Sequence, residues 1–132
     1  MKAQAYLSFD GNCQEALNFY KGILGGEVVN RETWEGKQTD IPEHYRNKLQ
    51  HAELKGKGFH FMAYDVAPDT PLTSGNKVCM SLDYSDTAEA QSAFEALSAQ
   101  GKINSPFQET SWNAHYGRCT DQYGVEWMVN AK

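Results

Sequence analysis

The stretch YLSFDGNCQEALNFYKGILGG, residues 6–26, decides the plan of this chain. Its first four residues alternate as those of a β-strand do, and the turn-forming sequence DGN interrupts them. Asn12 and Glu15 have the spacing of a helix-capping box, with Asn in the capping position. Gly25-Gly26 provides the left-handed conformation at which a helix ends. Between cap and stop, apolar residues recur at helical spacing: Ala16, Phe19, Tyr20, Ile23 and Leu24. The stretch therefore predicts a strand, a turn and a helix.

A weaker copy of this plan opens the second half of the chain. Residues 78–84 have the composition of a strand, and Asp86 with Glu89 forms a second cap pair. Gly101 ends the helix that this pair would begin. Its apolar stripe consists of Ala90, Ala93, Phe94 and Leu97. Because cap, stripe and stop recur in the same order, we interpret the chain as two copies of one module.

Three strands are expected after each predicted helix. They cover residues 28–34, 51–55 and 59–64 in the first copy, and residues 103–108, 115–120 and 125–130 in the second. Gly56-Lys57-Gly58 is expected to form a hairpin turn, and residues 41–46 a short helical insertion. The prediction is an α+β fold in which the order βαβββ occurs twice.

The two modules are expected to form a single domain, residues 1–132. Their predicted extents are about 1–67 and 77–132. Residues 68–76, which contain Pro68, Pro71 and Gly75, are the predicted linker between them. A chain of 132 residues is long enough for one hydrophobic core or two small fused ones.

Composition and charge exclude several classes of function. The net charge is -5, and Lys and Arg do not cluster, which argues against a nucleic-acid surface. No signal peptide is recognisable, and no apolar run approaches the ~18 residues of a membrane span. The three cysteines are odd in number and widely spaced, so they are expected to be reduced thiols in a cytoplasmic protein.

Four segments carry a resemblance to a known superfamily: residues 6–13, residues 15–26, His51-Ala52-Glu53-Leu54, and the run from Gln108 to Asn130. On these segments the chain resembles the PhnB-like branch of the vicinal oxygen chelate superfamily, which includes glyoxalase I, bleomycin-resistance proteins and extradiol dioxygenases. The resemblance implies paired modules that form a curved, cavity-enclosing mixed sheet with helices on the outside. It also implies a homodimer.

The resemblance bears on metal binding too. In metal-dependent relatives one ligand comes from each of four strands, and the matching positions lie near Ala5, Phe61, Cys79 and Met128. Three of these cannot ligate, so we expect no metal ligands and no cofactor. A shift of one residue would offer Gln4 and His60, which keeps a divalent metal open as an alternative.

Some relatives carry the label of a ubiquinone-pathway methyltransferase. The chain has no glycine-rich loop of the strand–GxGxxG–helix kind, so the sequence gives that label no physical support.

The candidate ligand-binding residues gather in the last third of the chain. Trp112 and Tyr116 could hold a flat ligand, while Gln108 and Thr110 orient its polar atoms. His115 is a candidate base beside them. The same residues are also compatible with packing and turn formation.

His60 is a further candidate ligand-binding residue. Alternation within its predicted strand places it on the opposite face from Phe59 and Phe61. It is therefore expected either to line a pocket or to face solvent or a partner subunit.

The preferred interpretation is a protein that binds a small organic molecule in a strand-lined cavity. The alternative is a divalent-metal-dependent lyase, isomerase or dioxygenase of the same superfamily. The sequence leaves open which ligand is bound and whether it is turned over.

Overall fold

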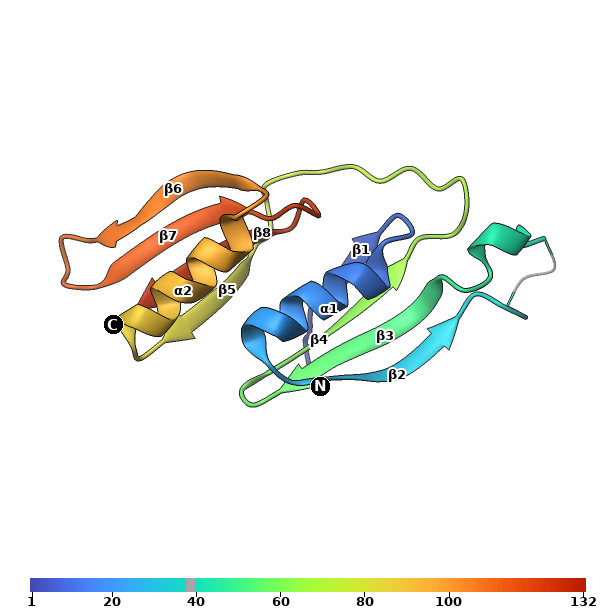
Figure 1. The fold of residues 1–132 in the computed structure, drawn as a ribbon, viewed down its shortest axis with the longest axis horizontal. Helices are drawn as coiled ribbons and strands as arrows, with labels where there is room; N and C mark the ends of the chain where they lie inside the picture. The colour runs from blue at the N-terminus through green and yellow to red at the C-terminus, as the bar shows by residue number, and fades with distance from the viewer. Residues whose placement is uncertain (38–39) are drawn as a thin grey trace. The chain divides into compact units, whose positions relative to one another are not determined.

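The computed structural model describes residues 1–37 and 40–132, and the chain divides into two compact units, residues 1–73 and 74–132. Each unit contains one α-helix and one four-stranded sheet, and Figure 1 shows their arrangement along the chain. In the described residues no helix is both long enough and apolar enough to cross a membrane.

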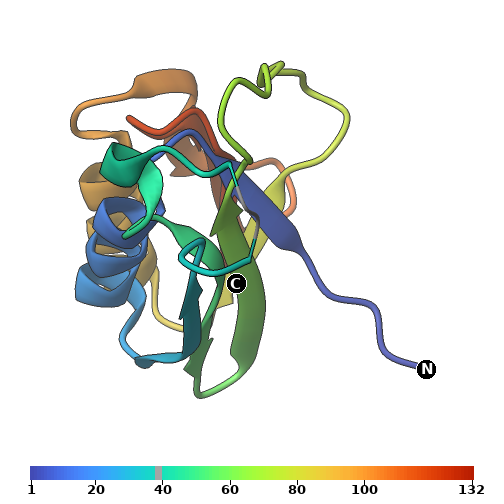
Figure 2. The ribbon, with the colours of Figure 1, turned by 90° about the vertical axis from the view of Figure 1, so that its right-hand side faces the viewer.

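Unit 1 contains the first βαβββ module. Its elements, in chain order, are β1 (Tyr6–Phe9), α1 (Cys13–Leu24), β2 (Glu27–Thr33), the short helix η1 (Glu43–Tyr45), β3 (Leu49–Gly56) and β4 (Phe59–Asp65). The sheet order is β1-β4-β3-β2, with β1 parallel to β4 and the other neighbours antiparallel. Figure 2 shows α1 along one face of this sheet, and the buried side chains of β3 and β4 form the core beneath it.

Unit 2 repeats this arrangement. Its elements are β5 (Met80–Tyr84), α2 (Thr87–Ser98), β6 (Lys102–Glu109), β7 (His115–Thr120) and β8 (Glu126–Ala131). The sheet order is β5-β8-β7-β6, and β5 is parallel to β8 as β1 is to β4. The core under α2 contains Phe94, Leu97, Trp127 and Val129. The prediction of an α+β fold built from two βαβββ modules is therefore confirmed.

Local differences from the sequence expectations have identifiable causes. Asn12 precedes α1, but its side chain makes no capping hydrogen bond, whereas Asp86 caps α2 by accepting from the backbone N–H of Ala88 at 2.8 Å. Strand β5 begins at Met80, so Cys79 lies before the strand instead of inside it. The predicted hairpin turn at residues 56–58 is confirmed, with Gly58 in the left-handed region at φ 85°. Residues 38 and 39, which fall within the predicted first module, lie outside the described part of the chain.

A buried carboxylate takes the place of the expected cap on α1. Asp65 ends β4 and is only 1% exposed. Its Oδ1 accepts the backbone N–H groups of Gly11 and Cys13, both at 2.9 Å, and its Oδ2 accepts the N–H of Leu49 at 2.8 Å. Asp65 thereby joins the start of α1, the start of β3 and the end of β4. It also accepts hydrogen bonds from backbone N–H groups that burial would otherwise leave unpaired.

Replacing Asp65 by Asn should destabilise unit 1 by about 2–4 kcal/mol, because an amide NH₂ group would face backbone donors and the charge on the acceptor would be lost. Urea unfolding followed by circular dichroism measures this change. The matched control is Asp10→Asn, an exposed carboxylate next to the same turn, which should leave stability within about 0.5 kcal/mol. Equal effects of the two substitutions would refute the role given to Asp65.

Trp127 is the largest fully buried side chain of unit 2, and its Nε1–H donates to Asp121 Oδ2 at 2.8 Å. Trp127→Ala should lower the free energy of unfolding by about 3–5 kcal/mol, because it leaves a cavity and removes that donor. Trp112→Ala is the control, since Trp112 is 65% exposed and its truncation should change stability little. A Trp127→Ala protein with unchanged melting would contradict this assignment.

Candidate functional site

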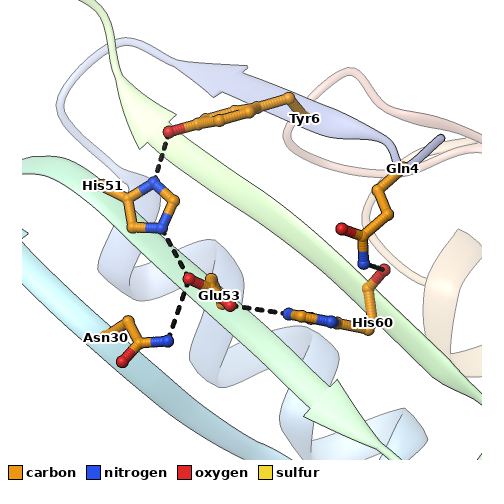
Figure 3. A network of polar contacts seen from close by, with 6 residues as sticks. All are labelled: Gln4, Tyr6, Asn30, His51, Glu53 and His60. Atoms are coloured by element: carbon orange, nitrogen blue, oxygen red, sulfur yellow. Dashed lines mark hydrogen bonds and ion pairs between the residues drawn. The ribbon is translucent and has the colours of Figure 1, made fainter. Parts of the chain in front are cut away.

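Polar side chains gather on the face of the unit 1 sheet that points away from α1. The alternation of each strand decides this. Ala52, Leu54 and Phe61 are buried on the helix side, so His51, Glu53 and His60 project from the opposite side. Figure 3 shows these three side chains, with Tyr6 of β1 and Asn30 of β2, converging over the strands.

Glu53 is the centre of this cluster. Its Oε2 accepts from Nε2 of His51 at 2.8 Å and from the side-chain amide of Asn30 at 3.0 Å (Figure 3). Its Oε1 accepts from Nε2 of His60 at 2.7 Å. The hydrogen bonds from His51 and His60, followed by that from Asn30, outweigh burial and lower the pKa of Glu53 from 4.5 to about 2. The carboxylate is therefore ionised at neutral pH.

An ionised carboxylate can only accept, and this determines where the protons of both imidazoles lie. His51 and His60 must each carry a proton on Nε2 in order to donate to Glu53. In the neutral rings Nδ1 is then an acceptor. The Tyr6 hydroxyl donates to Nδ1 of His51 at 2.5 Å. The result is a continuous chain of hydrogen bonds from Tyr6 through His51 to Glu53.

Tyr6 is the exposed end of this series of hydrogen bonds. Its ring packs edge-on against those of His51 and Tyr64, with centroids 5.6 and 5.2 Å away, while the residue as a whole is 48% exposed. Desolvation, together with the charges of nearby groups, of which Tyr64 has the largest effect, raises the pKa of Tyr6. The phenol therefore keeps its proton at neutral pH and acts as a donor.

An open cleft of about 600 Å³ lies next to Tyr6 in unit 1. Aromatic and small side chains line it, and no Lys or Arg is among them: Tyr6, Ser8, Trp34, Gln50, Tyr64, Val66, Ala67 and Thr70. Trp34 is held in the wall because its Nε1–H donates to the backbone carbonyl of Asp65 at 3.0 Å. The cleft therefore borders the polar cluster, and Tyr6 belongs to both.

The structure places the other sequence candidates in unit 2, around the β6–β7 turn. Gln108 is exposed on β6 and pairs in register with Tyr116 on β7. The Thr110 hydroxyl closes the turn by donating to the carbonyl of Ala114 at 3.0 Å. The His115 ring stacks on Phe107, with centroids 5.8 Å apart. Of these residues, Thr110 and His115 therefore already have structural partners.

Trp112 lies at the tip of this turn and lines a hollow of about 440 Å³ in unit 2. Asp83, Tyr84, Asn130 and Lys132 contribute to the same hollow. His60 is thus the one sequence candidate that the structure places in the Glu53 cluster.

The four positions that the resemblance carries over from metal-dependent relatives offer few metal-binding donor atoms in this chain. They fall near Ala5, Phe61, Cys79 and Met128, and Phe61 is buried in the core. Gln4 directs its amide N–H toward the carbonyl of His60 at 3.4 Å. In residues 1–37 and 40–132 no group of three or more His, Cys, Asp and Glu is arranged to hold an ion. No chemical step is assigned to a metal, and its absence from the working protein remains a prediction.

The two buried cysteines, Cys13 and Cys119, are poor nucleophiles in this fold. Burial, assisted by the Asp65 carboxylate, raises the pKa of the Cys13 thiol to about 12. Burial likewise raises the pKa of Cys119 to about 11, with Asp121 adding to the effect. Both thiols stay protonated at neutral pH and pack as small apolar groups.

Sequence reasoning did not select Tyr6 or Glu53, and it used His51 only within the resemblance to the superfamily and as the first residue of the predicted strand 51–55. The signal was present in the spacing. His51 and Glu53 are two residues apart in one strand, so they share a face. The short turn at residues 56–58 fixes the register that brings His60 opposite Lys55 and hence diagonal to Glu53. What the sequence does not show is how far the β1 side chain of Tyr6 reaches.

The depressed pKa of Glu53 makes its contribution to stability depend on pH. An unfolded Glu titrates near 4.3, above the folded value of about 2, so the contribution is fully present above about pH 5 and is lost as the pH falls toward 2. Glu53→Gln should therefore melt below wild type at pH 7, and the gap should narrow as the pH is lowered. Thermal melts between pH 7 and the lowest pH of cooperative melting measure this. Glu43→Gln, at an exposed carboxylate, is the control, and a gap for Glu53→Gln that stays constant would contradict the prediction.

Comparisons with known proteins agree with this fold. The family model described as 3-demethylubiquinone-9 3-methyltransferase matches residues 1–130. Protein YjdN of Escherichia coli K12 is 30% identical over 140 residues, which cover 98% of this chain and 95% of YjdN. The crystal structure of PA1353 from Pseudomonas aeruginosa is similar with a TM-score of 0.85 and 34% identity, covering 100% of this chain and 98% of the other.

More distant structures show the fold alone. A putative 3-demethylubiquinone-9 3-methyltransferase, the PhnB protein of Bacillus cereus, has 22% identity and a TM-score of 0.84, with both chains fully covered. A glyoxalase/bleomycin resistance/dioxygenase family enzyme of Burkholderia phytofirmans has 14% identity and a TM-score of 0.64, with 98% of each chain covered. The chain belongs to the family of the 3-demethylubiquinone-9 3-methyltransferase model, as a PhnB-like member of the vicinal oxygen chelate superfamily.

Proposed function

We propose that this protein binds a small organic molecule in the cleft of unit 1. The observation that carries the proposal is the cleft itself, about 600 Å³ in volume, walled by three aromatic side chains and bordered by the Glu53 cluster. Binding sites for small molecules have volumes of this order, and they combine apolar walls with a few oriented polar groups. Tyr6, Gln50 and Ser8 supply such groups here.

The lining residues favour a ligand of particular chemistry. The rings of Tyr6, Trp34 and Tyr64 offer faces and edges against which a flat molecule can pack. Because the lining contains no Lys or Arg and Glu53 lies close by, a carboxylate or phosphate would find no countercharge. The proposed ligand is therefore flat and either neutral or cationic.

Ligand binding by the unit 2 residues that the sequence analysis selected remains a second, weaker proposal. Trp112 is exposed and lines its own hollow, so it is the residue there with most freedom to contact a ligand. Gln108 and Tyr116 share the neighbouring strands. The partners already held by Thr110 and His115 support structural roles for those two residues.

Three further parts of the proposal concern the whole protein. They are that residues 1–132 act as a single domain of two modules, that the protein forms a homodimer, and that it works in the cytoplasm. The three cysteines are free thiols, which fits a reducing compartment. Light scattering on the purified chain tests the dimer directly, because a monomer mass of 14.8 kDa would contradict it.

Binding in the cleft is tested with three naphthalene probes that differ in charge: 2-naphthol, 2-naphthylmethylammonium and 2-naphthoate. In ¹H–¹⁵N NMR titrations the neutral and cationic probes should shift the resonances of Ser8, Gln50, Ala67 and Thr70, and the anionic probe should bind most weakly. Shifts confined to the surroundings of Trp112 would contradict the unit 1 cleft and favour the unit 2 hollow.

A filled cleft provides the matched test. Ser8→Trp places a large side chain among the lining residues and should weaken probe binding by at least about tenfold. Ser81→Trp is the control, since Ser81 is an exposed serine on β5, the strand of unit 2 that corresponds to β1, and it does not line the unit 1 cleft. Unchanged affinity in Ser8→Trp, with the variant folded, would defeat the proposal.

A further inference from the structure

A comparison of equivalent positions in the two modules divides the Glu53 cluster into a part common to both modules and a part specific to unit 1. Glu53 opposes Met62 in unit 1, and Arg118 opposes Met128 in unit 2, so Glu53 and Arg118 occupy equivalent positions. By the same register His60 corresponds to Glu126. Both modules thus place an oppositely charged or chargeable pair on this diagonal, Glu53–His60 in one and Arg118–Glu126 at 3.1 Å in the other.

The Tyr6–His51 pair has no such counterpart. Tyr6 opposes Met62 from β1, as Ser81 opposes Met128 from β5, so Tyr6 corresponds to Ser81. His51 corresponds to Tyr116. In unit 2 the equivalent positions therefore hold no imidazole and no relay to a carboxylate. A hydrogen-bonded diagonal pair that includes a carboxylate is common to both modules, whereas the hydrogen-bond chain from a phenol through an imidazole to a carboxylate belongs to unit 1.

We propose that Tyr6, backed by His51 and Glu53, is a proton-transfer site that interconverts the enol and keto forms of a flat carbonyl compound bound in the unit 1 cleft. This inference rests on the proposed function, since the compound must occupy the cleft that Tyr6 lines. In this assignment Tyr6 is the catalytic residue, because it alone of the three lines the cleft. His51 and Glu53 are positioning residues that act through Tyr6.

The hydrogen-bond chain accounts for each proton. In the ketonising direction the enol O–H bond breaks and its proton passes to the Tyr6 oxygen, while the original Tyr6 proton passes to Nδ1 of His51. An enolate and an imidazolium result, and the imidazolium is paired with the ionised Glu53 carboxylate at 2.8 Å. The Tyr6 hydroxyl then gives its proton to the enolate carbon, where a C–H bond forms. The proton on Nδ1 of His51 returns to the Tyr6 oxygen, so Tyr6 and His51 are both neutral again. No co-reactant is consumed.

Other kinds of catalysis by this Tyr6–His51–Glu53 hydrogen-bond chain are less compatible with the residues around it. Covalent catalysis needs a nucleophile beside the base, and Cys13 is fully buried with its thiol protonated. Ser8 lines the cleft, but within residues 1–37 and 40–132 its hydroxyl forms no hydrogen bond with an imidazole that could activate it. Reversible proton transfer on a bound ligand needs only the groups that the site provides.

The probe for this reaction is benzoylacetone, a flat, neutral 1,3-diketone with measurable enol and keto forms. Its enol is diluted from an organic solvent into buffer containing the full chain, and its relaxation is followed by ultraviolet absorbance. Wild type should accelerate relaxation, and Tyr6→Phe and His51→Gln should each reduce that acceleration by about a hundredfold. His44→Ala, which removes an exposed imidazole of the same unit, is the control and should retain full acceleration.

Affinity is measured alongside rate, so that a structural role is separated from a chemical one. NMR titration should give dissociation constants for benzoylacetone within about threefold of wild type in Tyr6→Phe and His51→Gln, so that the loss falls on the rate of the bound complex. Long-range ¹H–¹⁵N spectra of the free protein should show the Nε2–H form of His51, and Glu53→Gln should shift that equilibrium.

The outcomes separate the two proposals. Binding of benzoylacetone without acceleration, or equal acceleration by wild type and Tyr6→Phe, overturns the proton-transfer site and leaves the ligand cleft standing. Absence of binding by benzoylacetone and by all three naphthalene probes overturns both. A resting His51 that carries its proton on Nδ1 also contradicts the proposed relay.

Discussion

The carboxylate of Asp65 holds unit 1 in the arrangement on which its candidate site depends. It is buried, and it binds backbone N–H groups at the beginnings of both α1 and β3 from its own place at the end of β4. The contact with Leu49 ties the start of β3 to the end of β4. A slip of one residue between these strands would turn every side chain of β3 to the opposite face. Glu53 would then point into the core, where an ionised carboxylate without three donors is very costly.

The two faces of this sheet follow different physical rules. On the helix side, side chains such as Ala52, Leu54 and Ala63 fill a close-packed core, and their sizes are limited by one another. On the other side, packing imposes much less, so polar groups can occupy alternate positions provided that they satisfy each other. Glu53 does so through three side-chain donors, which is more than solvent exposure alone would require. This degree of order on an open face, beside a cleft, is expected of a site and is unusual for a solvated surface.

Sequence patterns predict the fold well because they report the buried half of each element. The apolar stripes of α1 and α2 and the glycines that follow them were sufficient to recognise two βαβββ modules. The cap of α1 could not be recognised this way, because its acceptor is Asp65, which lies 52 residues beyond Cys13 in the chain. The site was harder for the same reason. His60 was a sequence candidate, but its partnership with Glu53 depends on strand register, and that of Tyr6 with His51 depends on pairing between β1 and β4.

The comparison of the modules shows how one fold accommodates unlike chemistry. Where unit 1 has Glu53 and His60, unit 2 has Arg118 and Glu126, and the Arg118–Glu126 pair leaves Glu126 Oε2 buried without a partner in the described residues. A diagonal pair of a carboxylate and a hydrogen-bond donor satisfies either sheet, since only complementarity is needed and the carboxylate can stand on either strand. The positions of Tyr6 and His51 are under no such constraint from the fold, as Ser81 and Tyr116 show in unit 2. A phenol, an imidazole and a carboxylate in hydrogen-bonding sequence are therefore not required to build the module, and their presence in one copy alone is what a function located in unit 1 predicts.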